Sequence, residues 1–150
     1  MKIGFTGTRK GMTDEQKEEI SWMLQAQLGL ARAITGKVDE VHHGDCVGAD
    51  SDFHDLASGY DIVVHPPSVD KYRAFREGSE ILPPKSYLQR NMDIVDSCDI
   101  LIAAPEGEEQ QRSGTWATVR YARKRNKSIF IVSPDGIIHP EGPPVNVITK

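Results

Sequence analysis

Five short apolar runs, separated by amphipathic stretches, constrain the fold of this chain more than any other feature. Within each run the apolar residues follow one another instead of alternating with polar ones. The runs are Ile3–Thr6, Val38–His43, Asp61–His65, Asp99–Pro105 and Ser128–Val132. Continuous runs of this kind are typical of strands that are buried on both faces, as in a parallel sheet covered by helices on each side.

The stretches between the runs carry helical periodicity. Thr13 and Gln16 have the spacing of a capping box. Four apolar residues then repeat at helical spacing: Ile20, Met23, Leu24 and Leu28. Gly29 is the predicted stop of this helix. Three further helices are expected: Asp50–Gly59, Ser86–Cys98 and Ser113–Lys127.

Strands that alternate with helices predict one doubly wound α/β domain over residues 1–150, with helices on both faces. We expect five parallel strands in the order 3-2-1-4-5, because crossover connections are right-handed. Residues 66–84 break the pattern and are expected to form an irregular loop, functional or mobile, with a charged helical piece over Lys71–Glu77. Residues 134–150 are expected to form a C-terminal extension with an edge strand near Val145–Ile148.

The composition is that of an ordinary soluble domain, with 38% hydrophobic and 27% charged residues. Subtracting 22 acidic from 18 basic residues gives a net charge of −4. This disfavours a protein that coats nucleic acid through a basic surface, although it leaves room for a local basic pocket. We find no signal peptide, no apolar run of about 20 residues and only two cysteines, Cys46 and Cys98. We therefore expect a cytoplasmic protein without a membrane partner.

Four segments are predicted to meet at the carboxyl ends of the strands, where sheets of this kind bind their ligands. They are Gly7-Thr8-Arg9, the turn Gly44–Asp50, Arg90-Asn91 and Arg112-Ser113-Gly114-Thr115. Glycines let a backbone approach a ligand, and helix N-termini offer N–H groups and a partial positive charge. Three arginines beside two such termini predict an anion site, most naturally for a phosphate.

The candidate ligand-binding residues come from these four segments and from the end of the fourth strand. They are Gly7, Thr8, Arg9, Gly44, Asp45, Gly48, Asp50, Arg90, Asn91, Pro105, Arg112, Ser113, Gly114 and Thr115. We expect Arg9, Arg90 and the Ser113 terminus to hold the phosphate, and the Gly44–Asp50 turn to hold the sugar. Asp45 either reaches a ribose hydroxyl or caps its own turn.

The histidines do not predict a metal site, and no cofactor is expected. His42 and His43 are neighbours in a strand, so their side chains point to opposite faces, and we expect them to be structural. Cys46 lies beside a helix N-terminus, which predicts a lowered thiol pKa. No base partner for a nucleophilic cysteine is apparent in the sequence. Trp116 is expected in the core.

The order of these motifs resembles the SLOG superfamily, which includes DprA (Smf), the LOG phosphoribohydrolases and the YpsA-like proteins. Three stretches carry the resemblance in order between Met1 and Val132. They are Ile3–Arg9, His43–Asp50 with His54, and Arg90 through Pro105 to Ser113-Gly114-Thr115 and Tyr121-Ala122. The resemblance implies a Rossmann-like nucleotide-binding fold and, by analogy, a homo-oligomer.

The resemblance leaves three functions open. The preferred one is binding of a nucleotide or nucleotide-derived ligand, as a sensor, carrier or sequestering protein. A LOG-like nucleoside-monophosphate N-glycosidase is the second, with Arg90 and Asp45 as catalytic candidates. The catalytic glutamate of LOG enzymes corresponds here to Thr118, so a carboxylate would have to come from Asp45, Glu108 or Glu109.

The third function is DprA-like binding of single-stranded DNA. Such binding combines aromatic side chains with basic ones. The aromatic side chains available for it are Tyr60, Tyr72, Phe75, Tyr87 and Trp116. Tyr72 and Phe75 stand beside Lys71, Arg73 and Arg76 in the 66–84 segment.

Overall fold

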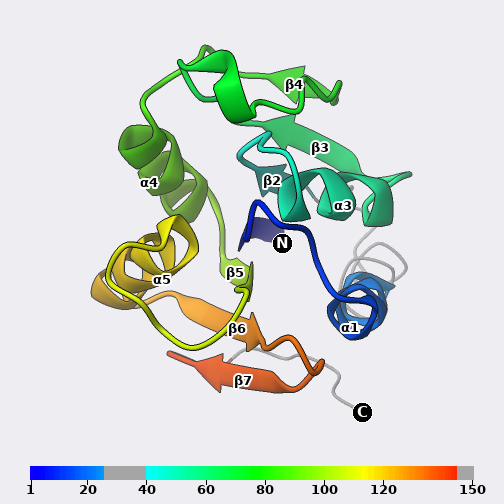
Figure 1. Cartoon of the computed structure of the whole chain (residues 1–150), viewed down its shortest axis with the longest axis vertical. Coiled ribbons are helices and arrows are strands. Elements are labelled where there is room, and N and C mark those ends of the chain that lie inside the picture. Colours follow the sequence, from blue (N-terminus) through cyan, green and yellow to red (C-terminus); the bar gives the residue numbers. More distant parts are fainter. Residues whose placement is uncertain (26–39, 145–150) are drawn as a thin grey trace.

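The structure, a computed structural model, describes residues 1–25 and 40–144. Seven strands form one sheet in the order β4-β3-β2-β1-β5-β6-β7 (Figure 1). The strands are β1 (Lys2–Gly7), β2 (Glu40–His43), β3 (Asp61–Val64), β4 (Glu80–Ile81), β5 (Ile100–Ala104), β6 (Ser128–Val132) and β7 (Ile138–Glu141). All neighbours pair in parallel except β6 and β7. The five predicted strands are β1, β2, β3, β5 and β6, and their predicted order is confirmed.

Helices cover both faces of the sheet. In residues 1–25 and 40–144 they are α1 (Asp14–Leu24), α3 (Ala49–Leu56), α4 (Tyr87–Ser97) and α5 (Gly114–Lys124), with one 3₁₀ turn, η2 (Asp70–Tyr72). Figure 1 shows α1 and α3 on one side of the sheet and α4 and α5 on the other. No helix in residues 1–25 and 40–144 is long and apolar enough to cross a membrane.

The side chains of β5 show why its apolar run is continuous. Ile100, Ile102 and Ala104 pack into the core beneath α1 and α3. Leu101 and Ala103 pack into a second core with α4 and α5. Because alternate residues of a strand face opposite sides of the sheet, a strand covered on both faces must be apolar at every position. Trp116 belongs to the second core, as predicted.

The predicted capping box at the start of α1 is confirmed. The Gln16 N–H donates to the Thr13 hydroxyl at 3.1 Å, and the Thr13 N–H donates to Gln16 Oε1 at 3.0 Å. The predicted positions Leu28 and Gly29 lie outside the described residues. Helix α5 ends at Lys124, one turn before the predicted end at Lys127.

One prediction about an irregular segment was wrong. Lys71–Glu77 is not a helix: only η2 is helical there, and the segment ends in β4, which pairs with β3. An edge strand that was not predicted, β7, covers Ile138–Glu141, and the predicted edge strand at 145–148 lies outside the described residues. Neither β4 nor β7 carries an apolar run, because both are edge strands with exposed residues.

Candidate functional site

A cavity of about 440 Å³ lies between the end of β1, the turn after β2 and the N-terminal ends of α4 and α5. Its volume is within the usual range for small-molecule sites. Eleven of the fourteen predicted ligand-binding residues line it: Gly7, Thr8, Arg9, Gly44, Asp50, Arg90, Asn91, Arg112, Ser113, Gly114 and Thr115. The structure therefore brings all four predicted segments to one place.

Asp45 does not line this cavity. It is fully buried with a φ of 56°, and its side chain points toward the 66–84 segment. There its carboxylate accepts hydrogen bonds from Arg73 Nε and the Arg76 N–H, each at 2.9 Å. The carboxylate thus neither faces the cavity nor caps its own turn, the two predicted alternatives, but holds the 66–84 segment against that turn.

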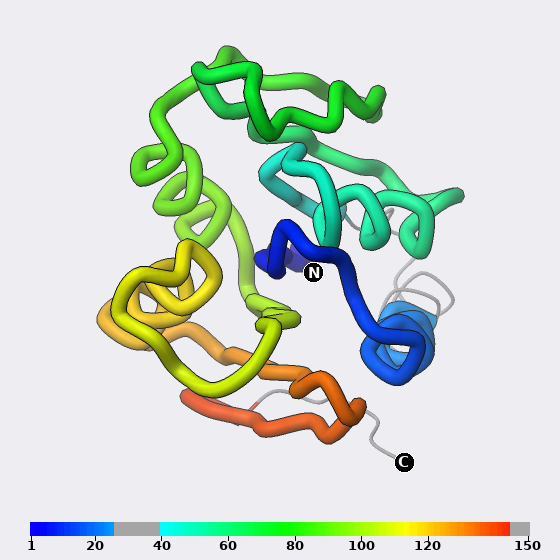
Figure 2. The backbone as a smooth tube through the Cα atoms, viewed as in Figure 1, coloured from blue at the N-terminus to red at the C-terminus, as the bar shows by residue number. Residues whose placement is uncertain are grey.

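Gly48 and Pro105 also lie outside the lining. A Cβ at Gly48 would lie 2.2 Å from the carbonyl oxygen of Arg9, so the turn after β2 presses against the loop after β1 (Figure 2). The carbonyl of Pro105 accepts a hydrogen bond from Gln16 Nε2 at 2.9 Å. Both residues thus contact segments next to the cavity without lining it.

The N-terminus of α5 supplies the clearest anion-binding feature of the cavity. The Ser113 hydroxyl accepts a hydrogen bond from the Trp116 N–H at 3.2 Å and caps the helix. The N–H groups of Gly114 and Thr115, in the first turn, have no partner within the helix. They therefore point partial positive charge toward the cavity.

Two arginines add full charges. Among the described residues neither Arg9 nor Arg112 takes part in an ion pair. The Arg9 guanidinium lies 4.1 Å from the centroid of the Tyr72 ring, which holds it at the edge of the cavity. Lys10, in contrast, is neutralised by Glu106 at 2.8 Å. The uncompensated charge of the lining is thus positive.

Arg90 is buried, and most of its guanidinium group bonds to other residues of the protein. Its Nη1 donates to the carbonyl oxygens of Gly44 and, at 3.5 Å, His65. Its Nη2 lies 3.4 Å from the Cys46 sulfur. Arg90 therefore fixes the turn after β2 and presents little of its guanidinium to a phosphate.

Asp50 and Cys46 lie beside Arg90. The Cys46 N–H donates to Asp50 Oδ2 at 3.1 Å. Burial raises the pKa of Asp50 to about 6, although Arg90 opposes the shift. The prediction of a lowered pKa for the Cys46 thiol was wrong: burial, together with the charge of Asp50, raises it against the opposing effect of Arg90.

The histidines form one buried pair and one partly buried pair. His42 Nδ1 and His65 Nε2 are 2.8 Å apart, and His43 Nε2 and His54 Nδ1 are 2.9 Å apart. Burial lowers the pKa of His43 to about 3 and that of His65 to about 4. Within the described residues no three histidine, cysteine or acidic side chains are arranged to hold a metal ion.

The carboxylates predicted for a hydrolase are not in the cavity. Thr118, at the position of the LOG glutamate, is buried, and its hydroxyl donates to the Gly114 carbonyl at 3.0 Å. Glu109 is paired with Arg123 at 2.9 Å, and Glu108 does not line the cavity. The carboxylates that do line it are Asp50 and Glu106.

Sequence reasoning missed several lining residues: Lys10, Tyr87, Ile94, Glu106 and Gln110. Two of them had a usable signal. Tyr87 and Ile94 are three residues before and four residues after Arg90, and this spacing puts side chains on one face of a helix.

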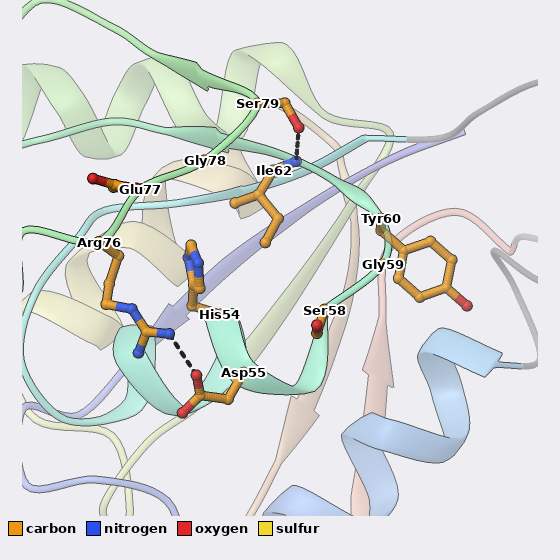
Figure 3. A pocket seen from close by; sticks show the side chains of 10 residues that line it. All are labelled: His54, Asp55, Ser58, Gly59, Tyr60, Ile62, Arg76, Glu77, Gly78 and Ser79. Atoms are coloured by element: carbon orange, nitrogen blue, oxygen red, sulfur yellow. Dashed lines mark hydrogen bonds and ion pairs between the residues drawn. The ribbon is translucent and has the colours of Figure 1, made fainter.

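A second pocket of about 410 Å³ lies between α3 and residues 76–79 (Figure 3). None of the predicted site residues lines it. The Arg76 guanidinium points to Asp55 and forms an ion pair with it (Figure 3). Its charge is therefore already neutralised, so the first cavity is the stronger anion site.

No family model matches this chain, and no curated protein matches it. Solved structures of other proteins share its fold, among them two with a TM-score of 0.60 or above. DNA processing protein A from Helicobacter pylori, studied for its single-stranded DNA binding mode, is 19% identical with a TM-score of 0.61. The match covers 87% of this chain and 64% of that protein, so the chain spans less than two thirds of its length.

The second is the molybdenum cofactor binding protein from Rippkaea orientalis. It is 21% identical with a TM-score of 0.60, and the match covers 88% of this chain and 76% of that protein. The predicted resemblance to DprA and its relatives is thus confirmed at the level of the fold.

Proposed function

We propose that the large cavity binds a nucleotide or nucleotide-derived ligand through its phosphate, as a sensor, carrier or sequestering protein. The observation that carries the proposal is the meeting of Arg9, Arg112 and the N-terminus of α5 around one cavity. No carboxylate of the described residues forms an ion pair with either arginine. An anionic ligand would balance both charges.

We assign the phosphate to the Ser113–Thr115 terminus, which lines the same cavity as Arg9 and Arg112. Helix N-termini bind phosphate through N–H groups and the helix dipole, and arginine adds charge-assisted hydrogen bonds. The remainder of the ligand then extends toward Gly44 and α4, where the lining also includes the apolar side chains of Phe5 and Ile94. Of the two named proteins that share the fold, one is described as binding single-stranded DNA and the other as binding the molybdenum cofactor.

Thermal melting and calorimetry test the proposal with nucleoside monophosphates, ribose 5-phosphate and the matching nucleosides. At about 100 times its dissociation constant a ligand stabilises the fold by about 2.7 kcal/mol. For a chain of this size this raises the melting temperature by about 5–10 °C. Nucleosides, which lack the phosphate, are expected to bind far more weakly. Equal binding of nucleosides and nucleotides would refute the phosphate site.

Arg112→Ala is expected to weaken phosphate-ligand binding by about 10-fold or more, because hydrogen bonds to charged groups contribute about 1.5–3 kcal/mol. Lys124→Ala is the matched control, since it removes a positive charge from the far end of α5. The control should bind like the wild type. Free base released in these incubations would instead assign a hydrolase, with Asp50 as its available carboxylate.

Binding of single-stranded DNA is the second candidate function. Arg73 lies 4.5 Å from the centroid of the Phe75 ring, which is 57% exposed, and Arg9 stacks on Tyr72 nearby. Aromatic and cationic side chains together suit stacked bases and their phosphates. A salt-dependent gel shift with an oligonucleotide, lost in Phe75→Ala, would favour this function over mononucleotide binding.

A further inference from the structure

Two buried side-chain polar atoms in the described part of the chain have no hydrogen-bond partner, and they are neighbours. They are Arg90 Nε and the hydroxyl oxygen of Tyr87, three residues apart near the start of α4. Both side chains line the large cavity. Native proteins leave few buried polar atoms unsatisfied, because each one is costly. Two of them in one cavity point to a ligand group.

The interactions that Arg90 already makes within the protein limit which ligand group it can bind. Its Nη1 and Nη2 already bind Gly44, His65 and Cys46, and its charge interacts with the carboxyl of Asp50. Arginine binds phosphate best through two parallel N–H groups, whereas both Nη atoms of Arg90 already have protein partners. Nε is its one nitrogen without a partner among the described residues, and its N–H suits one acceptor oxygen.

Tyr87 completes this position. The Arg90 Cζ lies 5.3 Å from the centroid of the Tyr87 ring, and the Tyr87 side chain is half-buried. The Tyr87 ring therefore lies against the Arg90 guanidinium, and both side chains line the cavity. An acceptor oxygen there receives hydrogen bonds from Arg90 Nε and from the Tyr87 hydroxyl.

We infer that Tyr87 and Arg90 form a second subsite that binds a carbonyl oxygen of the ligand's base, apart from the phosphate site at α5. The inference rests on the proposed function and names its ligand class. That class is nucleotides whose base carries an exocyclic carbonyl where adenine carries an amino group. An amino group there would face the donor of Arg90, and two donors cannot bond.

Calorimetry with inosine monophosphate, adenosine monophosphate and ribose 5-phosphate tests the subsite. We expect inosine monophosphate to bind about 10-fold or more tightly than adenosine monophosphate, because a site built around hydrogen bonds rejects a mismatched group strongly. Tyr87→Phe should weaken inosine monophosphate binding by about 3- to 10-fold, the effect of one hydrogen bond. Binding of ribose 5-phosphate should not change.

Tyr121→Phe is the matched control, because its hydroxyl donates to Asp96 at 2.8 Å on the outside of α5. It should bind all three ligands like the wild type. Tyr87→Phe should melt at or above the wild-type temperature, since it removes an unpartnered hydroxyl, and this shows that the variant is folded.

Three outcomes overturn the subsite. Equal affinity for the inosine and adenosine nucleotides removes the carbonyl preference. An equal loss of ribose 5-phosphate binding in Tyr87→Phe places the phosphate, and not the base, at Arg90. If none of the phosphate compounds binds, the proposed function is refuted, and the subsite, which rests on that function, is refuted with it.

Discussion

At Gly48 the turn after β2 touches the loop after β1 so closely that no side chain fits between them. A Cβ there would lie 2.2 Å from the Arg9 carbonyl oxygen, and the residue has a φ of 87°. The adjacent Ala49 N–H donates to the Thr8 carbonyl at 2.9 Å. Gly48 therefore holds Arg9 in place at the edge of the cavity, although it does not line the cavity.

Gly48→Ala is expected to lower the free energy of unfolding by about 3 kcal/mol or more and to weaken phosphate-ligand binding. About 1–2 kcal/mol comes from the left-handed backbone, and the rest comes from the clash with the loop that carries Arg9. Gly59→Ala is the control: its φ is 94°, but nothing lies within 4 Å of its Cβ position. Urea denaturation and calorimetry compare the two, and equal effects would contradict the role given to the close contact.

The sequence does not predict the direction in which each side chain of the site points. Asp45 and Asp50 come from the same turn, yet Asp45 faces Arg73 and Asp50 faces the cavity. The difference arises from the positive φ of Asp45, which nothing in its sequence context indicates. Tyr87 was predictable only from its helical spacing to Arg90.

Among the elements, α1 is tied to the sheet through one buried amide. Gln16 is fully buried, and its Nε2 donates to the carbonyls of Pro105 and Val132, each at 2.9 Å. These carbonyls follow β5 and end β6, so one side chain links the start of α1 to the carboxyl ends of two strands.

Gln16→Met is expected to lower the free energy of unfolding by about 2–4 kcal/mol. The substitution keeps the size of the side chain but leaves buried backbone groups without partners, at about 1–3 kcal/mol for each group. Gln25→Met, at the exposed end of α1, serves as the control and should change stability by less than about 0.5 kcal/mol. Urea denaturation followed by tryptophan fluorescence gives both values. A Gln16 variant as stable as the control would show that water or local rearrangement satisfies the carbonyls.

The elements that could be predicted are those that helices bury on both faces. β1, β5 and β6 are buried almost throughout, so their apolar runs were sufficient to predict them as strands. β4 has two exposed residues, and β7 contains Pro140, so their pairing depends on neighbouring strands and not on their own sequence. The same holds for the 66–84 segment, which is held by Asp45.

For the whole molecule, two buried histidines, one from each pair, make stability depend on pH. His43 and His65 have a folded-state pKa of about 3 and about 4, compared with 6.5 in the unfolded chain. Below pH 6.5 the unfolded chain binds protons that the folded chain does not, so acid favours unfolding until the folded histidines also protonate. Asp50 acts in the opposite direction. Its pKa of about 6 is above the unfolded value of 3.8, so its contribution is present at low pH and lost above pH 6.

At pH 5 each of the two histidines lowers the free energy of unfolding by about 2 kcal/mol relative to pH 7.5. Asp50 raises it by about 1 kcal/mol over the same change in pH. We therefore expect a net loss of about 2–3 kcal/mol, measured by urea denaturation at the two pH values. In His65→Gln the loss should be about 2 kcal/mol smaller, because one titrating group is gone. His139→Gln, at an exposed position of β7, should keep the wild-type difference. Equal stability of the wild type at pH 7.5 and pH 5 would mean that the pairs open to water and protonate within the folded protein.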